Sequence, residues 1–219
     1  MGTSRSHVVL LGPPGAGKGT QAGMLSEHLR VPHISTGDIL RGEVQSGSVL
    51  GQQAKKLMDR GELVSDDLIL GIVKERIEEA DCKDGFILDG FPRSLAQASG
   101  MEELGAKMPP LVAVSLEVPV AEVIGRLSQR RTCRKCKSMA HQTFNPPKVE
   151  GVCDRCGGDL YQREDDKEDV IQARLGVYRR ETGPLLSFYR DRGSLIQVNG
   201  TGSSKDVFGR LVAGLGGGS

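Results

Sequence analysis

A glycine-rich loop near the N-terminus constrains this chain more than any other feature. The apolar run at residues 8–11 leads directly into residues 12–20, which contain G-x-x-x-x-G-K-G-T. In phosphate-binding loops (P-loops) of this kind, glycines let successive backbone N–H groups face an anion, and the following helix adds its positive N-terminal end. The pattern predicts a nucleotide site in which Lys18 reaches the β- and γ-phosphates. Because Gly19 follows the lysine, the hydroxyl that normally contacts Mg²⁺ is displaced to Thr20.

Short apolar runs bounded by turn residues recur along the chain and are typical of buried strands. They lie at residues 8–11, 86–88, 111–114 and 195–198, and longer stretches with helical spacing lie between them. Strands that alternate with helices favour right-handed crossovers and a parallel sheet, so the sequence predicts an α/β fold. The glycines from Gly214 to the C-terminus predict a disordered tail.

Two stretches interrupt this alternation. Residues 35–64 hold short amphipathic pieces punctuated by glycines, which indicates a small helical insertion. Residues 126–166 hold four of the five cysteines and little apolar periodicity, which indicates a second insertion with its own means of holding together. Residues 1–34, 65–125 and 167–219 would then form the core.

The second insertion carries a strong metal pattern. Cys133-x-x-Cys136 is followed, after sixteen residues, by Cys153-x-x-Cys156, as in tetrahedral zinc sites. Two disulfides or a redox pair are the alternatives, and a reducing compartment disfavours the disulfides. Because four thiolates saturate the ion, the predicted Zn²⁺ is structural. Cys82 has no partner at such a spacing and is expected to end a helix.

A carboxylate is expected beside the P-loop. Asp89 follows the apolar run 86–88, and the carboxyl ends of parallel strands share one crevice. We predict that Asp89 holds Mg²⁺ through water, since Mg²⁺ keeps much of its hydration shell. A turn or helix-capping role is the alternative.

The overall composition limits the partners. The chain has 29 Lys and Arg against 28 Asp and Glu, so it gives no electrostatic reason to bind nucleic acid or a membrane. No run approaches the roughly 18 apolar residues of a spanning helix. We expect a monomer in the cytoplasm or, after removal of a transit peptide, in an organelle matrix such as the chloroplast stroma. Residues 1–6 fit a loose N-myristoylation pattern but are interpreted as a start tag or trimmed leader.

Four motifs, at residues 12–20, 34–38, 85–93 and 161–163, resemble the signatures of adenylate kinases and occur in that family's order. The resemblance covers roughly residues 7–213. It implies a P-loop kinase core with a five-stranded parallel sheet flanked by helices, an AMP-binding domain at 35–64 and a zinc-containing lid at 126–166. The implied reaction is reversible, Mg²⁺-dependent conversion of ATP and AMP to two ADP, which serves adenine nucleotide homeostasis.

The resemblance also implies site residues. The catalytic set would be Lys18, Asp89, Arg93, Arg130, Arg163 and Arg174. ATP would contact Gly15, Ala16, Gly17, Lys18, Gly19, Thr20, Arg126, Arg130, Met139, Ala140 and Gly202. AMP would contact Thr36, Arg41, Glu62, Leu63, Val64, Gly90, Phe91, Pro92, Arg93, Gln97, Arg163 and Arg174. Arginine suits the phosphate because it bonds bidentately, and the Gln97 amide offers the donor and acceptor that an adenine edge requires.

Some alternatives stay open on the sequence alone. Ala140 stands where lids of this family often carry an aromatic residue near the ATP adenine, so selectivity for ATP over GTP is in question. A GTP-using AMP kinase or a UMP/CMP kinase is therefore a second interpretation. From Arg126 to Lys148 there are seven basic and no acidic residues, which suits the binding of a polyphosphate. The same basic stretch also permits a third interpretation, a zinc-ribbon nucleic-acid binder.

Overall fold

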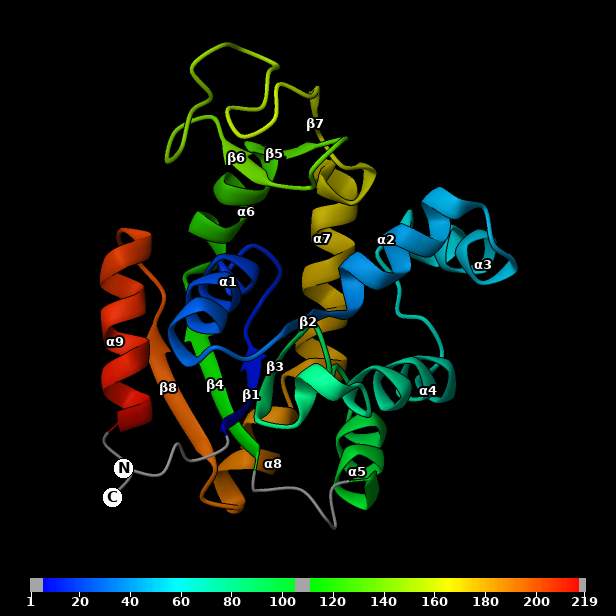
Figure 1. Ribbon diagram of the computed structural model, residues 1–219, viewed down its shortest axis with the longest axis vertical. Coiled ribbons are helices and arrows are strands. Elements are labelled where there is room, and N and C mark those ends of the chain that lie inside the picture. Colours follow the sequence, from blue (N-terminus) through cyan, green and yellow to red (C-terminus); the bar gives the residue numbers. More distant parts are fainter. Residues whose placement is uncertain (1–5, 105–110, 217–219) are drawn as a thin grey trace.

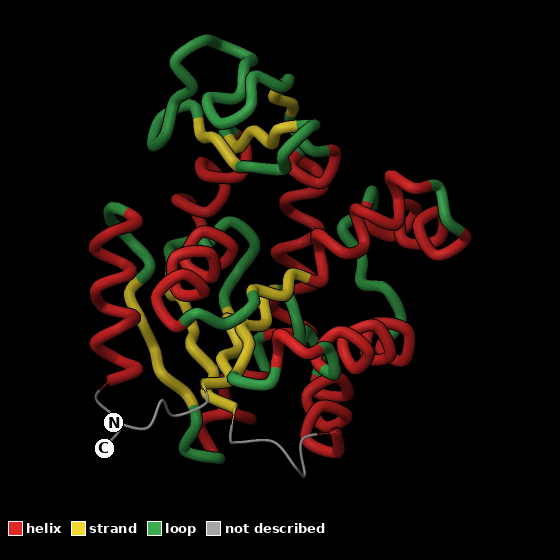
Figure 2. Tube along the Cα trace, in the orientation of Figure 1, coloured by secondary structure: helices red, strands yellow, loops and turns green. Residues whose placement is uncertain are grey.

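The computed structural model describes residues 6–104 and 111–216, and it is built around one parallel sheet (Figures 1 and 2). The strand order is β2-β3-β1-β4-β8, with all neighbours parallel. The strands are β1 (Ser6–Leu11), β2 (His33–Ser35), β3 (Gly85–Asp89), β4 (Leu111–Glu117) and β8 (Leu195–Asn199). The predicted α/β fold with a five-stranded parallel sheet is confirmed. The sequence did not reveal β2, because it is an edge strand of only three residues.

Helices cover both faces of the sheet because successive strand residues point to opposite sides. Val8 and Leu10 pack in one apolar cluster with α1 (Lys18–Leu29) and α9 (Ser204–Gly216). Val9 and Leu11 pack in another, which draws on α4 (Asp66–Ile77), α5 (Leu95–Leu104) and α8 (Leu185–Asp191). The core is thus a three-layer sandwich.

Between β2 and α4 the chain forms two short helices, α2 (Thr36–Ser46) and α3 (Val49–Met58), which project from the body (Figure 1). Ser35 and Ser48 cap them, accepting hydrogen bonds from the N–H groups of Asp38 and Gly51. A Cβ on Gly51 would lie 2.0 Å from the Glu43 carbonyl oxygen, so glycine allows the two helices to pack closely.

The cysteine-rich stretch forms a separate layer at the top of Figure 1. Helix α6 (Val120–Ser128) leads into β5 (Arg130–Cys133), β6 (Met139–His141) and β7 (Leu160–Tyr161), an antiparallel sheet in the order β6-β5-β7. A turn of 3-10 helix (η3, Glu164–Asp166) and α7 (Glu168–Val177) return the chain to the core. Among the described residues from 130 to 166, the buried residues of hydrophobic type are Cys133 and Cys153, so this layer lacks an apolar core of its own.

The remaining segments are short. Cys82 ends a 3-10 turn, η1 (Ala80–Cys82), as expected. After α7 the chain passes through one turn of π-helix, η4 (Tyr178–Thr182), into α8. In the described ranges, no helix is both long and apolar enough to cross a membrane.

One expectation about the C-terminus is wrong. Gly214 and Gly216 belong to α9, not to a disordered tail, because Val207 and Leu211 anchor that helix in the core. The last residues of the expected tail, 217–219, lie outside the described residues, as do residues 1–5 of the N-terminal leader.

Candidate active site

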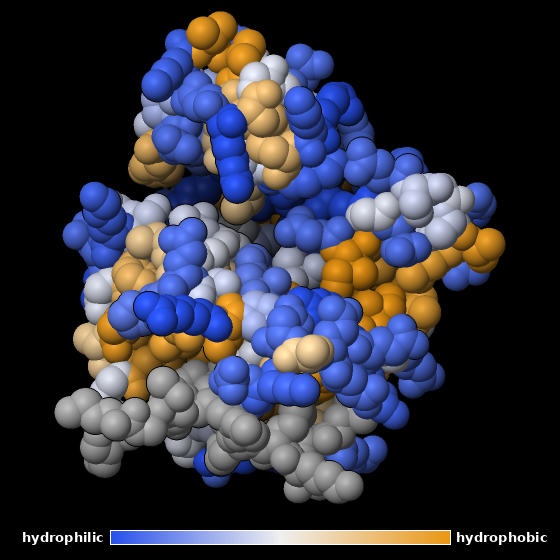
Figure 3. Space-filling model, viewed as in Figure 1, coloured by the Kyte–Doolittle hydropathy of each residue, from blue (hydrophilic) through white to orange (hydrophobic). Residues whose placement is uncertain are grey.

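A cavity of about 670 Å³ lies between the core, the α2–α3 pair and the cysteine-rich layer. Its mouth is visible in Figure 3 as a recess bordered mainly by hydrophilic residues. The P-loop forms its floor, at the carboxyl ends of the parallel strands, where open α/β sheets bind ligands. Three segments far apart in sequence therefore enclose one site.

The P-loop has the conformation that the glycines predicted. Gly15 and Gly17 have φ of 84° and 95°, values that L side chains rarely adopt. Lys18 donates to the carbonyl oxygens of Gly12 and Pro13, at 2.8 and 2.9 Å. Burial lowers the pKa of Lys18 to about 8, and nearby arginines contribute in the same direction. The cavity floor thus holds an ammonium group that an anion would stabilise.

Asp89 ends β3 beside this lysine. Burial opposes its ionisation, but the adjacent His33 ring and the charge of Lys18 outweigh that, so the pKa of Asp89 lies below its ordinary value. The Asp89 Oδ2 atom is 3.5 Å from His33 Nε2. A Cβ on Gly19 would lie 3.2 Å from the same oxygen, so Gly19 lets the carboxylate approach the start of α1. No sequence pattern pointed to His33, because its role depends on β2 pairing with β3.

The expected AMP side is a compact polar network. Thr36 Oγ1 donates to the Gly90 carbonyl oxygen at 2.8 Å, and Arg93 Nε donates to the same oxygen at 2.6 Å. Burial, followed by repulsion from Arg174, lowers the pKa of Arg93 to about 10. Arg41 pairs with Asp38 at 2.6 Å. Both guanidinium groups thus stand at the cavity wall.

Gln97 is buried and its amide is held at both ends. Its Oε1 accepts from the Arg93 backbone N–H at 2.7 Å, and its Nε2 donates to Asp66 Oδ1 at 2.7 Å. Ser94 Oγ donates to the same Asp66 oxygen at 3.0 Å. The sequence analysis missed Asp66, which stands at the start of α4, 31 residues before Gln97.

Three arginines meet where the cysteine-rich layer joins the core. Arg130 makes two hydrogen bonds to the fully buried Asp166, at 2.8 and 2.5 Å, and Arg174 bonds the same carboxylate at 3.2 Å. Arg174 also pairs with Asp165 at 3.2 Å. Arg163 donates to Thr132, and burial lowers its pKa to about 10. The two aspartates, to which no sequence pattern pointed, hold Arg130 and Arg174 in place.

The wall above the P-loop is basic and aromatic. Arg126 donates to the carbonyl oxygens of Ala16 and Gly200, at 3.3 and 3.0 Å. Its Cζ lies 5.9 Å from the centre of the Phe144 ring, which is 4.6 Å from the His141 ring. Phe144 lines the cavity and is 66% exposed. It supplies an aromatic face three residues after His141. The sequence analysis considered only position 140 for an aromatic residue and did not predict this one.

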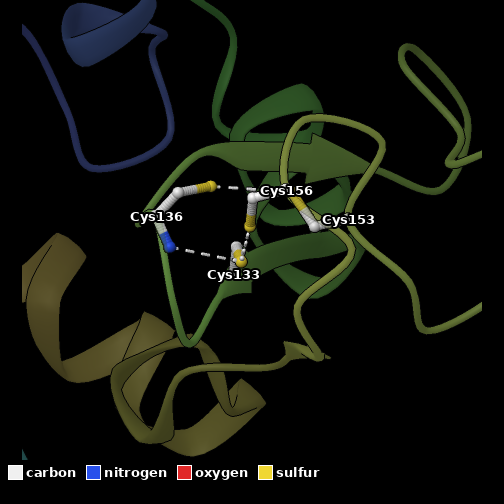
Figure 4. Close-up of side chains that lie close together, drawn as sticks. All are labelled: Cys133, Cys136, Cys153 and Cys156. Carbon is white, nitrogen blue, oxygen red and sulfur yellow. Dashed lines mark hydrogen bonds between the residues drawn. The ribbon is translucent and has the colours of Figure 1, made fainter.

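The four paired cysteines converge in the layer above the cavity (Figure 4). All four sulfur atoms lie within 4.8 Å of one another, with Cys133 and Cys156 at 3.5 Å and Cys136 and Cys153 at 3.6 Å. Tetrahedral zinc at about 2.3 Å from each sulfur would place the sulfurs about 3.8 Å apart. The four sulfur atoms therefore already have a spacing that fits such an ion.

The cavity brings nearly all the expected nucleotide-contact residues together. Every one lines it except Ala16 and Phe91, which are 1% and 0% exposed. His141 also lines it. Lining residues that were not expected include Asp38, Phe144, Asn145, Asp165, Tyr178 and Thr182.

A P-loop that faces an arginine-lined wall across one cavity defines a nucleoside monophosphate kinase. In such an enzyme the phosphates of a nucleoside triphosphate and of a nucleoside monophosphate must meet between these two surfaces. The family model for adenylate kinase matches residues 10–194. The chain is 51% identical over 209 residues to the adenylate kinase of Thermodesulfovibrio yellowstonii, covering 94% of this chain and 97% of the relative. It is 49% identical over 209 residues to that of Archaeoglobus fulgidus, covering 94% and 96%.

The chain therefore belongs to the adenylate kinase family. It is an enzyme that transfers a phosphoryl group between ATP and AMP to form two ADP, as the sequence analysis predicted. This assignment replaces the alternative interpretation of the chain as a zinc-ribbon nucleic-acid binder.

Proposed function

We propose that the cavity binds ATP over the P-loop and AMP against α2 and α3, with the arginines between them neutralising the group in transfer. The observation that supports this most is that Lys18, Arg93, Arg130 and Arg174 all line the same cavity, so four cations face one space. A transferring phosphoryl group carries negative charge on several oxygens and needs such surroundings.

On the AMP side, Arg41 and Arg93 would bind the phosphate and Gln97 would read the adenine edge. Arg41 would exchange its contact with Asp38 for the phosphate. Thr36, Gly90, Pro92 and the backbone of Glu62, Leu63 and Val64 line the same wall. Phe91 is completely buried, so its role would be to support the wall from behind.

On the ATP side, the backbone of Gly15, Ala16, Gly17, Gly19 and Thr20 would bind the phosphates together with Lys18. Arg126 and Phe144 present a cation and an aromatic ring on one side of the space expected for the base. Met139, Ala140 and Gly202 complete its lining. Phe144 thus offers a stacking surface that Ala140 does not.

The chemistry is an in-line displacement. An anionic phosphate oxygen of AMP attacks the γ-phosphorus, a new P–O bond forms, and the bond to the β-phosphate oxygen breaks with its electrons leaving on ADP. No general base is required, because the nucleophile is already ionised. Lys18, Arg93, Arg130, Arg163 and Arg174 would act by positioning the groups and stabilising charge, and closure of the lid would exclude water.

Two metals fit the residues present. Asp89, ionised and next to the P-loop, would hold Mg²⁺ through water, and that ion would screen the ATP phosphates. Cys133, Cys136, Cys153 and Cys156 would hold one structural Zn²⁺, because their sulfurs already cluster. With four thiolates bound, no position remains for an activated water.

The same proposal divides the chain into a core (1–34, 65–125, 167–219), an AMP-binding domain (35–64) and a lid (126–166). The boundary at the start of the lid falls within α6, which would carry lid movements into the core. That the protein acts as a monomer without a nucleic-acid or membrane partner, in the cytoplasm or an organelle matrix, stays a prediction.

A nucleotide panel tests the base assignments. Purified protein with Mg²⁺ would be assayed with ATP or GTP as donor and with AMP, UMP or CMP as acceptor. We expect ATP and AMP to give the highest kcat/KM. Faster turnover of UMP or CMP than of AMP would reject the assignment of the α2–α3 side.

A further inference from the structure

We propose that Asp66 is a positioning residue that fixes the orientation of the Gln97 amide and thereby sets the preference for a 6-aminopurine at the monophosphate site. The inference rests on the proposed role of Gln97 as reader of the AMP base. Asp66 lines no wall of the cavity, so it would act through Gln97.

The local contacts permit one amide orientation. Asp66 Oδ1 accepts from Gln97 Nε2 at 2.7 Å, and the Arg93 backbone N–H donates to Gln97 Oε1 at 2.7 Å. A carboxylate can only accept and a backbone N–H can only donate. A flipped amide would place oxygen against the carboxylate and NH₂ against the N–H group, which are two repulsive contacts in a buried place.

Asp66 is half-buried, and its two partners are largely shielded from solvent. Ser94 is 8% and Gln97 3% exposed. Ser94 Oγ donates to Asp66 Oδ1 at 3.0 Å and also accepts from the Gln97 backbone N–H at 3.2 Å. The Asp66 carboxylate is thus directed at the Gln97 side chain by a second hydrogen bond.

After these contacts, the amide keeps one N–H and one oxygen lone pair for a ligand. A 6-aminopurine offers a donor at its 6-amino group beside an acceptor at N1. A 6-oxopurine offers the reverse, an acceptor at O6 beside a donor at N1. Since the orientation is fixed, the amide matches one of these edges and opposes the other. The enzyme uses AMP, so the fixed orientation is the one that suits the 6-aminopurine.

The test compares AMP with IMP, because IMP has the reversed edge without the extra 2-amino group of GMP. Asp66→Asn replaces the carboxylate with an amide that can also donate, so it tolerates a flipped Gln97. We expect the ratio of kcat/KM for AMP to that for IMP to fall about tenfold, with kcat for AMP changing less than about threefold. This fold-change is about 1.4 kcal/mol, the order of one unsatisfied buried contact.

Asp67→Asn is the matched control. Asp67 stands in the same first turn of α4 but is exposed, so its substitution removes the same helix-end charge without touching Gln97. We expect this variant to keep the wild-type AMP/IMP ratio. Asp66→Ala is a second variant, which frees the amide to rotate and should also lower the ratio. Thermal unfolding of each variant verifies folding.

One result would overturn the inference: an unchanged AMP/IMP ratio in both Asp66 variants. If kcat/KM for AMP and for IMP falls by the same factor, the ratio is likewise unchanged and the role of Asp66 is purely structural. Gln97→Ala separates this from a failure of the proposed function. If Gln97→Ala leaves the ratio unchanged, Gln97 does not read the base; if it lowers the ratio while the Asp66 variants do not, only the positioning role fails.

Discussion

At the scale of single residues, the site is defined by cations that are buried before any phosphate arrives. Lys18 and Arg93 both have lowered pKa values, and burial is the largest cause in each case. Desolvation disfavours the charged form, and an anion bound alongside restores it. The free enzyme is therefore more sensitive to alkaline pH than its nucleotide complexes.

This difference predicts a pH profile. Lys18 is protonated below its pKa of about 8 and progressively neutral above it. Since kcat/KM reports ionisations of the free enzyme, kcat/KM for MgATP should fall with rising pH above about 8, approaching tenfold per unit. The value for AMP at saturating ATP should stay nearly flat from pH 7 to 9, because the pKa values of Arg93 and Arg163 are about 10. Parallel profiles for the two substrates would contradict the role of Lys18.

Arg93 allows a direct test of the phosphate clamp. Arg93→Ala should lower kcat by roughly 10²–10³-fold, the usual loss when one preorganised donor to developing charge is removed. Arg93→Lys keeps the positive charge but loses the bidentate geometry, so its kcat should lie between those of the wild type and the alanine variant. Steady-state rates and thermal unfolding would be measured together. Near-normal turnover of the alanine variant would refute the assignment.

At the scale of elements, the backbone is strained directly after the first pair of cysteines, Cys133 and Cys136. Lys137, directly after Cys136, has a φ of 61°, a left-handed conformation that is unfavourable for a residue with a Cβ. Its Nζ donates to the Arg134 carbonyl oxygen and to Gln45 Oε1 in α2, each at 2.8 Å. Within the described ranges, this is the hydrogen bond that joins segments 35–64 and 126–166. The side chain thus compensates for part of the cost of its backbone.

Two substitutions separate these contributions. Lys137→Ala removes both hydrogen bonds but keeps the left-handed backbone, whereas Lys137→Gly removes the bonds and relieves the strain. The glycine variant should be more stable than the alanine variant by about 1 kcal/mol in free energy of unfolding. Denaturant unfolding with zinc present measures this difference. If alanine is equally stable, the φ of 61° carries no cost.

At the scale of the whole molecule, the core and the lid are stabilised by different means. The apolar clusters involve the parallel sheet and its helices, with a small one where α6 meets α7 at the base of the lid. The lid above it has the cysteine cluster in place of an apolar core. Loss of zinc should therefore destabilise the lid and leave the core largely unaffected.

Cys153→Ser tests this division. It removes one of four ligands, so we expect zinc content to fall and the melting temperature to drop by roughly 4–8 °C, corresponding to a loss of about 2 kcal/mol. Far-UV circular dichroism at 25 °C should change little, because the core clusters remain. Cys82→Ser, outside the cluster, should keep full zinc. A variant that retains zinc and its melting temperature would contradict the structural site.

Much of this arrangement could be predicted from contiguous motifs. The P-loop and the paired cysteines are local patterns with fixed spacing, and the four core strands are short apolar runs. Residues that act through partners distant in sequence gave no such signal. Asp66 meets Gln97 only because α4 and α5 pack together, and Asp166 meets Arg130 only after the lid has folded. The glycine-rich end was misjudged because tertiary packing of α9 outweighed the low helix propensity of glycine.

The separate stabilisation of lid and core also bears on adaptation to temperature. A substitution that tightens or loosens the metal knuckles changes how readily the lid melts while leaving the sheet as it is. We therefore expect the temperature at which activity is lost to depend more strongly on the residues of the lid than the temperature at which the sheet unfolds does. Selection could then adjust the temperature at which activity is lost through a few positions between 130 and 166, without changing the packing of the sheet.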